Sequence, residues 1–260
     1  MNLRRGDRPL LIGHKGAAAL EPENTLRSLS RAVELGCDLV EFDVLELSDG
    51  TLVLAHSDDL LEVSHGAAAG QVHTQSLAAL REVAPELPTF DDALELLARA
   101  DGVGIHVDLK WYGYEESAAR AIARHDVVER TLVSTCHARS LHAFAALEPR
   151  VARGITYPFD SRGLAQRRLL APLTPPVLRG LRRALPFRIG GLLERAAASV
   201  AVLHYSVVSR ATVARVHARG SAVLTWTVDH LPTLERMVGA GVDGVITNDP
   251  RLFSDYTPEP

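Results

Sequence analysis

Short apolar runs rich in branched residues alternate along the chain with longer segments in which apolar positions recur every three or four residues. The first pattern is typical of buried strands and the second of amphipathic helices. The predicted strands are Leu10–Gly13, Leu39–Val44, Gly104–Leu109, Thr131–Thr135, Ala152–Thr156, Ala201–His204, Ala222–Thr227 and Gly244–Thr247. The predicted helices include Thr25–Leu35, Phe90–Arg99, Ser117–Arg124, Arg139–Leu147, Arg210–Arg219 and Leu231–Ala240.

This order of elements predicts a parallel sheet, because strands separated by helices pair through right-handed crossovers. Eight repeats of the unit favour a closed (β/α)8 TIM barrel over the alternative, an open doubly wound sheet. No Gly-x-Gly-x-x-Gly follows the first strand, so a dinucleotide-binding fold loses its main support. We therefore expect residues 1–260 to form one α/β domain, a single catalytic barrel.

Two segments depart from the alternation. Residues 46–88 are predicted to form a short insertion after the second strand, with an extra hairpin strand at Thr51–Ala55. Residues 160–200 are basic and leucine-rich, with eight arginines, and four prolines argue against one long helix there. This segment is interpreted either as a flap over the site that meets lipid or phosphate, or as a cover on the outer surface of the barrel.

Composition narrows the class of protein. The net charge of −4, from 28 basic and 32 acidic residues, disfavours a general nucleic-acid binder. The two cysteines, Cys37 and Cys136, form no CxxC pair and are expected to be small buried residues, with a bridge as the alternative. No stretch approaches the ~20 apolar residues of a spanning helix, and no secretory signal is seen, so a cytoplasmic protein is expected.

Polar residues interrupt the apolar strands where a barrel places its reactive groups. His14 and Lys15 follow the first strand, at its C-terminal end. Glu41 and Asp43 are two residues apart in the second strand and so share one face. Burying two neighbouring carboxylates is costly unless a cation or strong donors compensate. The alternative, an ion-paired surface couple, fits poorly with the apolar residues around them.

The third strand repeats this arrangement with Asp108 and Lys110. Asp108 could complete an oxygen-rich site suited to a hard cation such as Mg²⁺ or Ca²⁺, with Mn²⁺ as a further option. Lys110 points the same way and can meet an anionic oxygen. His56, which ends another apolar run, pairs with His14 as the two groups needed to take one proton and return another. Trp226, in a later strand, is either a wall of the pocket or ordinary barrel packing.

These blocks resemble the glycerophosphodiester phosphodiesterase family, in the family's order and over nearly the whole chain. The blocks that match are His14-Lys15-Gly16, Pro22-Glu23-Asn24-Thr25, Glu41-x-Asp43-Val44, Asp49-Gly50 with His56, Pro88-Thr89-Phe90, Asp108-x-Lys110, and the Trp-Thr-Val and Gly-Val-Asp-Gly endings. Each block alone is weakly specific, and the set together is specific.

The resemblance implies a role for each candidate residue. It makes His14 and His56 the general acid and base, Glu41, Asp43 and Asp108 the ligands of one divalent cation, Lys15 and Lys110 contacts to the phosphate, and Trp226 part of the pocket lining. It also implies a route in which the neighbouring hydroxyl of the glycerol attacks phosphorus. One histidine would deprotonate that hydroxyl while the other protonates the departing alcohol.

The function expected from the resemblance is metal-dependent hydrolysis of a glycerophosphodiester to glycerol 3-phosphate and an alcohol such as choline or ethanolamine. A lysophospholipase D acting on lysophospholipids is the first alternative, with peripheral membrane contact through residues 160–200. A non-catalytic phosphoester-binding barrel is the second. The partner in each case is a small molecule and not a nucleic acid.

Three residues depart from the family pattern. Lys15 stands in place of the usual arginine, Asp108 in place of glutamate, and Ser57 in place of the aspartate after the histidine. Lysine is a point charge where arginine offers a bidentate fork, and aspartate is one methylene shorter than glutamate. These departures bear on substrate choice and metal preference more than on the class of reaction.

Overall fold

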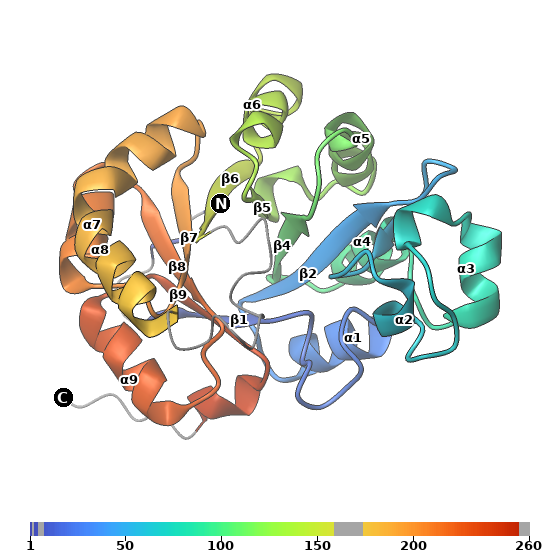
Figure 1. The fold of residues 1–260 in the computed structure, drawn as a ribbon, viewed down its shortest axis with the longest axis horizontal. Coiled ribbons are helices and arrows are strands. Elements are labelled where there is room, and N and C mark those ends of the chain that lie inside the picture. The colour runs from blue at the N-terminus through green and yellow to red at the C-terminus, as the bar shows by residue number, and fades with distance from the viewer. Residues whose placement is uncertain (2, 5–7, 159–173, 255–260) are drawn as a thin grey trace.

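Eight parallel strands form a closed barrel (Figure 1). The computed structural model describes the chain except for residues 2, 5–7, 159–173 and 255–260. The strands are β1 (Leu10–Gly13), β2 (Leu39–Glu46), β4 (Gly104–Leu109), β5 (Thr131–Thr135), β6 (Ala152–Tyr157), β7 (Val200–His204), β8 (Ala222–Trp226) and β9 (Gly244–Thr247). They follow the order β1-β9-β8-β7-β6-β5-β4-β2, and pairing of β1 with β2 closes the ring. The predicted TIM barrel is confirmed.

Helices on the outside of the ring connect successive strands. They are α1 (Leu26–Glu34), α4 (Phe90–Ala98), α5 (Glu115–Arg124), α6 (Ala138–Leu147), α7 (Thr174–Arg195), α8 (Arg210–His217) and α9 (Leu231–Ala240), with short 3-10 turns η2 (Val128–Arg130) and η5 (Pro250–Phe253). Thr25, Thr89 and Ser209 begin α1, α4 and α8 because each side chain accepts a hydrogen bond from a backbone N–H of the first turn. The predicted strands and the predicted helices agree with the structure to within two residues at each end.

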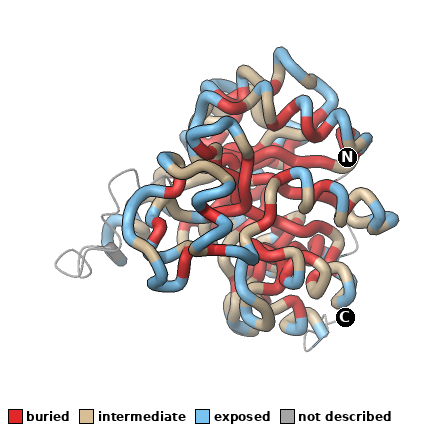
Figure 2. The backbone as a smooth tube through the Cα atoms, turned by 90° about the vertical axis from the view of Figure 1, so that its right-hand side faces the viewer, coloured by how far each residue is buried: buried red, intermediate tan, exposed pale blue. Residues whose placement is uncertain are grey.

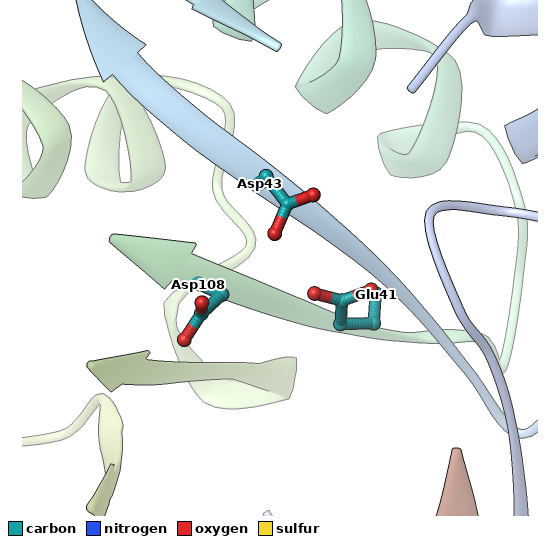
Figure 3. Close-up of side chains that lie close together, drawn as sticks. All are labelled: Glu41, Asp43 and Asp108. Atoms are coloured by element: carbon teal, nitrogen blue, oxygen red, sulfur yellow. The ribbon is translucent and has the colours of Figure 1, made fainter. Parts of the chain in front are cut away.

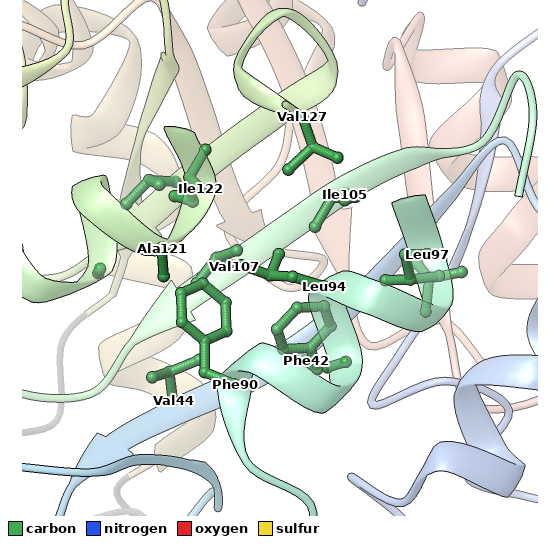
Figure 4. Close-up of a cluster of buried hydrophobic side chains, with 14 of the residues drawn as sticks. Phe42, Val44, Phe90, Leu94, Leu97, Ile105, Val107, Ala121, Ile122 and Val127 are labelled. Atoms are coloured by element: carbon green, nitrogen blue, oxygen red, sulfur yellow. The ribbon is translucent and has the colours of Figure 1, made fainter. Parts of the chain in front are cut away.

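Alternation along the strands separates two layers of side chains. Phe42 of β2 points outward and packs against Phe90 of α4, with ring centroids 6.0 Å apart (Figure 4). Its neighbours Glu41 and Asp43 therefore point into the barrel, because successive side chains face opposite sides of a strand. Figure 2 shows that the buried residues lie in the interior of the molecule and the exposed residues around its outside. Cys37 is buried in the same outer layer, and both cysteines are free thiols.

The insertion forms a small lobe beside the barrel (Figure 1). Its elements are β3 (Leu52–Leu54), α2 (Leu60–Val63), η1 (Val72–Thr74) and α3 (Leu77–Val83). The predicted hairpin strand is confirmed, since β3 pairs antiparallel with β2. Leu60, Val72 and Leu80 fill a separate apolar cluster under the lobe. The two short helices were not predicted, because four and seven residues are too few for a helical period to show.

The prediction against a long helix in the basic segment was wrong. Helix α7 runs for 22 residues. Pro175 and Pro176 lie in its first turn, where backbone N–H groups have no partner inside the helix anyway. Only Pro186 is interior, and there the burial of Leu185 and Ile189 against the barrel offsets the lost hydrogen bond.

Helix α7 packs beside α8 and covers the outer side of the barrel. The outer-cover interpretation therefore fits residues 174–195, whereas residues 160–173 of the predicted flap lie outside the described residues. None of the described helices is both long enough and apolar enough to cross a membrane.

Candidate active site

Three carboxylates meet at the C-terminal mouth of the barrel (Figure 3). Glu41 and Asp43 project inward from β2, and the strand register places Asp108 of β4 directly beside Asp43. One oxygen from each carboxylate lies within 4.8 Å of the others. Glu41 and Asp43 are only 4% and 1% exposed. The predicted cluster is therefore assembled by the register of two neighbouring strands.

Polar partners hold these carboxylates in place. The Nζ of Lys110 lies 2.5 Å from Asp43 Oδ1 and 2.6 Å from Asp108 Oδ2. Asn24 donates from Nδ2 to Asp43 Oδ2 at 2.9 Å and accepts from the Asp43 N–H at 3.1 Å. The backbone N–H of Lys15 donates to Glu41 Oε2 at 2.8 Å. Each carboxylate is thus fixed in one orientation.

The charges of the cluster are only partly balanced. Burial and the neighbouring Asp43 raise the pKa of Glu41 well above its usual range. Burial opposes ionisation of Asp43 as well, but the Lys110 ammonium holds the pKa of Asp43 below its usual range. The Lys110 ammonium pairs with two of the three carboxylates, so the cluster carries more negative than positive charge. Three carboxylate donors at this spacing fit a hard divalent cation such as Mg²⁺ or Ca²⁺.

A buried chain of hydrogen bonds orients Asp108. The Ser134 hydroxyl donates to Asp108 Oδ1 at 2.6 Å, and His106 Nε2 lies 2.8 Å from the same hydroxyl oxygen. Since the serine proton is already used, His106 must donate from Nε2. Its Nδ1 is then an acceptor, for which no partner is found in the described part of the chain. Burial lowers the pKa of His106 to about 4, consistent with a neutral ring.

A second series of hydrogen bonds sets the tautomer of His14. Asn248, after β9, donates from Nδ2 to Asp229 Oδ2 at 2.6 Å, which fixes the orientation of its amide. The amide oxygen therefore faces His14 Nδ1, 2.7 Å away, and must accept a proton from it. Nε2 of His14 is then the unprotonated nitrogen, and it points into the site, 4.0 Å from Glu41 Oε2. Burial also lowers the pKa of the ring, so His14 is prepared to accept a proton.

His56 follows β3 and lines the same cavity as His14. Desolvation lowers the pKa of His56 from its ordinary value of 6.5, and Lys110 and Lys15 act in the same direction against Asp43. His56 is exposed, whereas His14 is half-buried. His56 is thus the more accessible of the two histidines.

The predicted site residues surround one cavity of about 110 Å³, with a single exception. The cavity is lined by seven of the eight: His14, Glu41, Asp43, His56, Asp108, Lys110 and Trp226. Lys15 turns away, since its Nζ donates to Glu23 Oε1 at 2.9 Å. Trp226 lines the cavity, and its ring packs against that of His204 in a T-shaped arrangement, with ring centroids 5.0 Å apart. Sequence reasoning assigned no role to Ser134, Asn248 or Asp229, although all three occur at strand ends, where reactive groups gather.

Comparison with known proteins agrees with this geometry. Residues 14–252 match the model of the glycerophosphoryl diester phosphodiesterase family. The chain belongs to this family. It is therefore a member of a family of phosphoric diester hydrolases, and the resemblance seen in the sequence motifs is confirmed.

Relatives of similar length carry the same name. The chain is 27% identical to a glycerophosphodiester phosphodiesterase of Caldanaerobacter subterraneus, over 94% of this chain and 96% of that protein. It is 29% identical to a probable glycerophosphodiester phosphodiesterase 1 of Mycobacterium tuberculosis, over 93% and 90%.

Solved structures share the fold. A putative glycerophosphoryl diester phosphodiesterase of Silicibacter pomeroyi superposes with a TM-score of 0.77 at 21% identity, over 97% of this chain and 96% of that one. A phosphodiesterase of Oleispira antarctica, in complex with the product sn-glycerol-3-phosphate, gives a TM-score of 0.74 at 24% identity, over 95% and 96%.

Proposed function

We propose that this protein hydrolyses glycerophosphodiesters to glycerol 3-phosphate and an alcohol, with His14 and His56 as general base and acid. The observation that carries the proposal is that two histidines line one cavity together with three carboxylates and Lys110. The product named for the Oleispira antarctica relative supports the choice of substrate class.

The hydrogen bonds of His14 support its role as the base. His14, unprotonated at Nε2, takes the proton of the glycerol hydroxyl next to the phosphoester, and that oxygen bonds to phosphorus. The bond from phosphorus to the alcohol oxygen breaks, and His56 gives its proton to the departing alkoxide. Water then opens the cyclic phosphate with the two histidines in reversed roles, which yields glycerol 3-phosphate.

Glu41, Asp43 and Asp108 would hold the divalent cation, which when bound supplies positive charge against the phosphate oxygens. Lys110 adds a donor for a non-bridging oxygen, at the mouth between two carboxylates. Lys15 would reach the phosphate only after its ammonium leaves Glu23. Its backbone N–H, by contrast, already positions Glu41.

The direct test is hydrolysis of glycerophosphocholine by chelator-treated protein, followed by phosphorus NMR. We expect no turnover until Mg²⁺, Ca²⁺ or Mn²⁺ is restored, and glycerol 3-phosphate as the phosphorus-containing product. Full activity after chelation would contradict the cation site. Release of phosphocholine would mean that the phosphoester bond to glycerol is cleaved and not the bond to choline, which would contradict the proposed reaction. Ligand binding without turnover would favour the non-catalytic barrel.

The proton transfers also predict a pH profile. The general base works unprotonated, and burial lowers the pKa of His14 from 6.5. The general acid works protonated, and desolvation lowers the pKa of His56 as well. The kcat/KM of the cation-loaded protein should therefore rise with pH around a midpoint below 6.5, as His14 loses its proton, and fall again at higher pH, as His56 loses its own. The profile should be measured at saturating cation, so that loss of cation at low pH is not mistaken for the titration. A rise centred above pH 6.5 would contradict His14 as the base.

The position of α7 on the outer side of the barrel favours a small diester over a lysophospholipid as the substrate. The basic segment that suggested lipid binding contributes no described residue to the cavities beside His56. Lysophosphatidylcholine in the same assay checks this, since the proposal expects it to be the poorer substrate.

A further inference from the structure

A second and larger cavity opens on the other side of His56. Its volume is about 640 Å³, and it lies between the insertion and the turn that leads into α1. Its walls combine apolar residues such as Leu54 and Val83 with carboxylates. His56 lines both cavities and so stands at the junction between them.

The position of this cavity assigns it to one half of the substrate. His14 and the three carboxylates surround the smaller cavity alone, where the phosphate and the attacking hydroxyl must lie. The group that leaves must lie within hydrogen-bond reach of the acid that protonates it, which is His56. Beyond His56 the space continues into the larger cavity, so the departing alcohol extends into it.

The lining of the cavity indicates the chemistry of that alcohol. Glu23, Glu62 and Glu86 contribute carboxylates, whereas no lysine, arginine, phenylalanine, tyrosine or tryptophan is found among the described lining residues. Glu23 is occupied by Lys15 at 2.9 Å, and Glu86 lies 3.7 Å from Arg27. For Glu62, on α2, the described residues provide no ion pair. Its carboxylate is available to a positively charged group.

We propose that this cavity binds the departing alcohol and selects amino alcohols that carry a primary ammonium group, with Glu62 as the contact. The inference rests on the proposed function and adds the identity of the leaving group. A primary ammonium donates three hydrogen bonds and suits carboxylate acceptors. A quaternary ammonium donates none and is recognised by the faces of tryptophan, tyrosine or phenylalanine, which the described lining does not offer.

One of the three departures from the family pattern lies in the wall of this cavity. Ser57, which stands in place of the usual aspartate, lines the cavity together with Glu62 and Ser64. The other two departures, Lys15 and Asp108, lie on the phosphate and cation side. The departure at Ser57 is therefore the one that bears on the alcohol.

The experiment compares kcat/KM of the full chain on glycerophosphoethanolamine, glycerophosphocholine and the neutral glycerophosphoglycerol. The variants are Glu62→Gln and, as a matched control, Glu82→Gln, an exposed carboxylate of α3 that does not line the cavity. We expect the unaltered protein to prefer glycerophosphoethanolamine to glycerophosphocholine. Glu62→Gln should lower kcat/KM for glycerophosphoethanolamine about two- to fivefold, as for loss of one solvent-accessible ion pair, and leave glycerophosphoglycerol unchanged.

The outcomes separate the two proposals. Equal effects of Glu62→Gln on all three substrates, or the same effects from Glu82→Gln, would overturn the alcohol site while the phosphodiesterase activity stands. A preference for glycerophosphocholine in the unaltered protein would also overturn it. Failure to cleave any of the three diesters would overturn the proposed function, and the alcohol site with it.

Discussion

Replacing Glu41 by glutamine should stabilise the cation-free protein and abolish its response to divalent cations. Glu41 is buried beside Asp43, and this burial and repulsion raise the pKa of its carboxyl. Glutamine keeps an oxygen for the Lys15 N–H, which now donates to Glu41 Oε2 at 2.8 Å, but carries no charge. A gain of about 1 kcal/mol would appear as a rise of about 2–4 °C in melting temperature for a chain of this size.

The gain should grow with pH. A carboxyl with a raised pKa in the folded state binds its proton more tightly there than in the unfolded chain, so the native protein loses stability as pH rises from 4.5 toward the folded value. Glutamine has no proton to lose and escapes that loss. Melting curves of the chelated proteins at pH 5 and pH 8 measure the difference.

The activity of Glu41→Gln should fall although its stability rises. Loss of one cation ligand removes several kcal/mol of transition-state stabilisation, or about 10²-fold or more in kcat/KM. Glu95→Gln serves as the control, since Glu95 is an exposed carboxylate on α4 that pairs with Arg99. A variant that melts lower than the parent, or that is still stabilised by Mg²⁺ or Ca²⁺ to the same extent, would contradict the role given to Glu41.

The barrel and the acidic cluster could be predicted because both follow from short-range rules. The period of two along a strand puts Glu41 and Asp43 on one face, and parallel pairing of successive strands brings Asp108 beside them. The prediction that the basic segment contains no long helix was wrong because it relied on one such short-range rule. The rule that proline breaks helices holds for interior positions, whereas Pro175 and Pro176 occupy a first turn and Pro186 is offset by packing that the sequence does not reveal.

The orientation of side chains within the site could not be predicted from spacing. Lys15 carries a positive φ of 50°, and the tight turn that continues through Gly16 directs its ammonium to Glu23 and its N–H to Glu41. An added Cβ at Gly16 would lie 2.4 Å from the backbone of Ser28, so only glycine allows this approach.

The tautomer of His14 was equally hidden, because it depends on Asn248, 234 residues away in the sequence. Both lie at the C-terminal ends of adjacent strands, β1 and β9, which is visible only once the barrel is closed. Asp229 and Asn248 both follow predicted strands. Their position after strand ends was the signal in the sequence from which a role in the site could have been predicted.

The two histidines should respond differently to the leaving group, and this response assigns their roles. His14→Ala removes the base that deprotonates the glycerol hydroxyl, a step that every diester shares. Its loss in kcat/KM, about 10²–10⁴-fold, should be nearly the same for glycerophosphoethanolamine and for a nitrophenyl ester of glycerol 3-phosphate. His56→Ala removes the acid that protonates the departing oxygen. An alkoxide needs that proton, whereas a nitrophenolate leaves without it.

His56→Ala should therefore cleave the ethanolamine diester far more slowly than the parent protein does. It should cleave the nitrophenyl diester at close to the parent's rate. Single-turnover rates of cyclic phosphate formation give the cleanest comparison, because His56 also acts in the later opening by water. His217→Ala is a suitable control, since His217 pairs with Asp243 at 2.8 Å on α8, away from the cavity. If His14→Ala were the variant rescued by nitrophenolate, the roles would be exchanged, and the chain from Asp229 through Asn248 would hold an acid rather than a base.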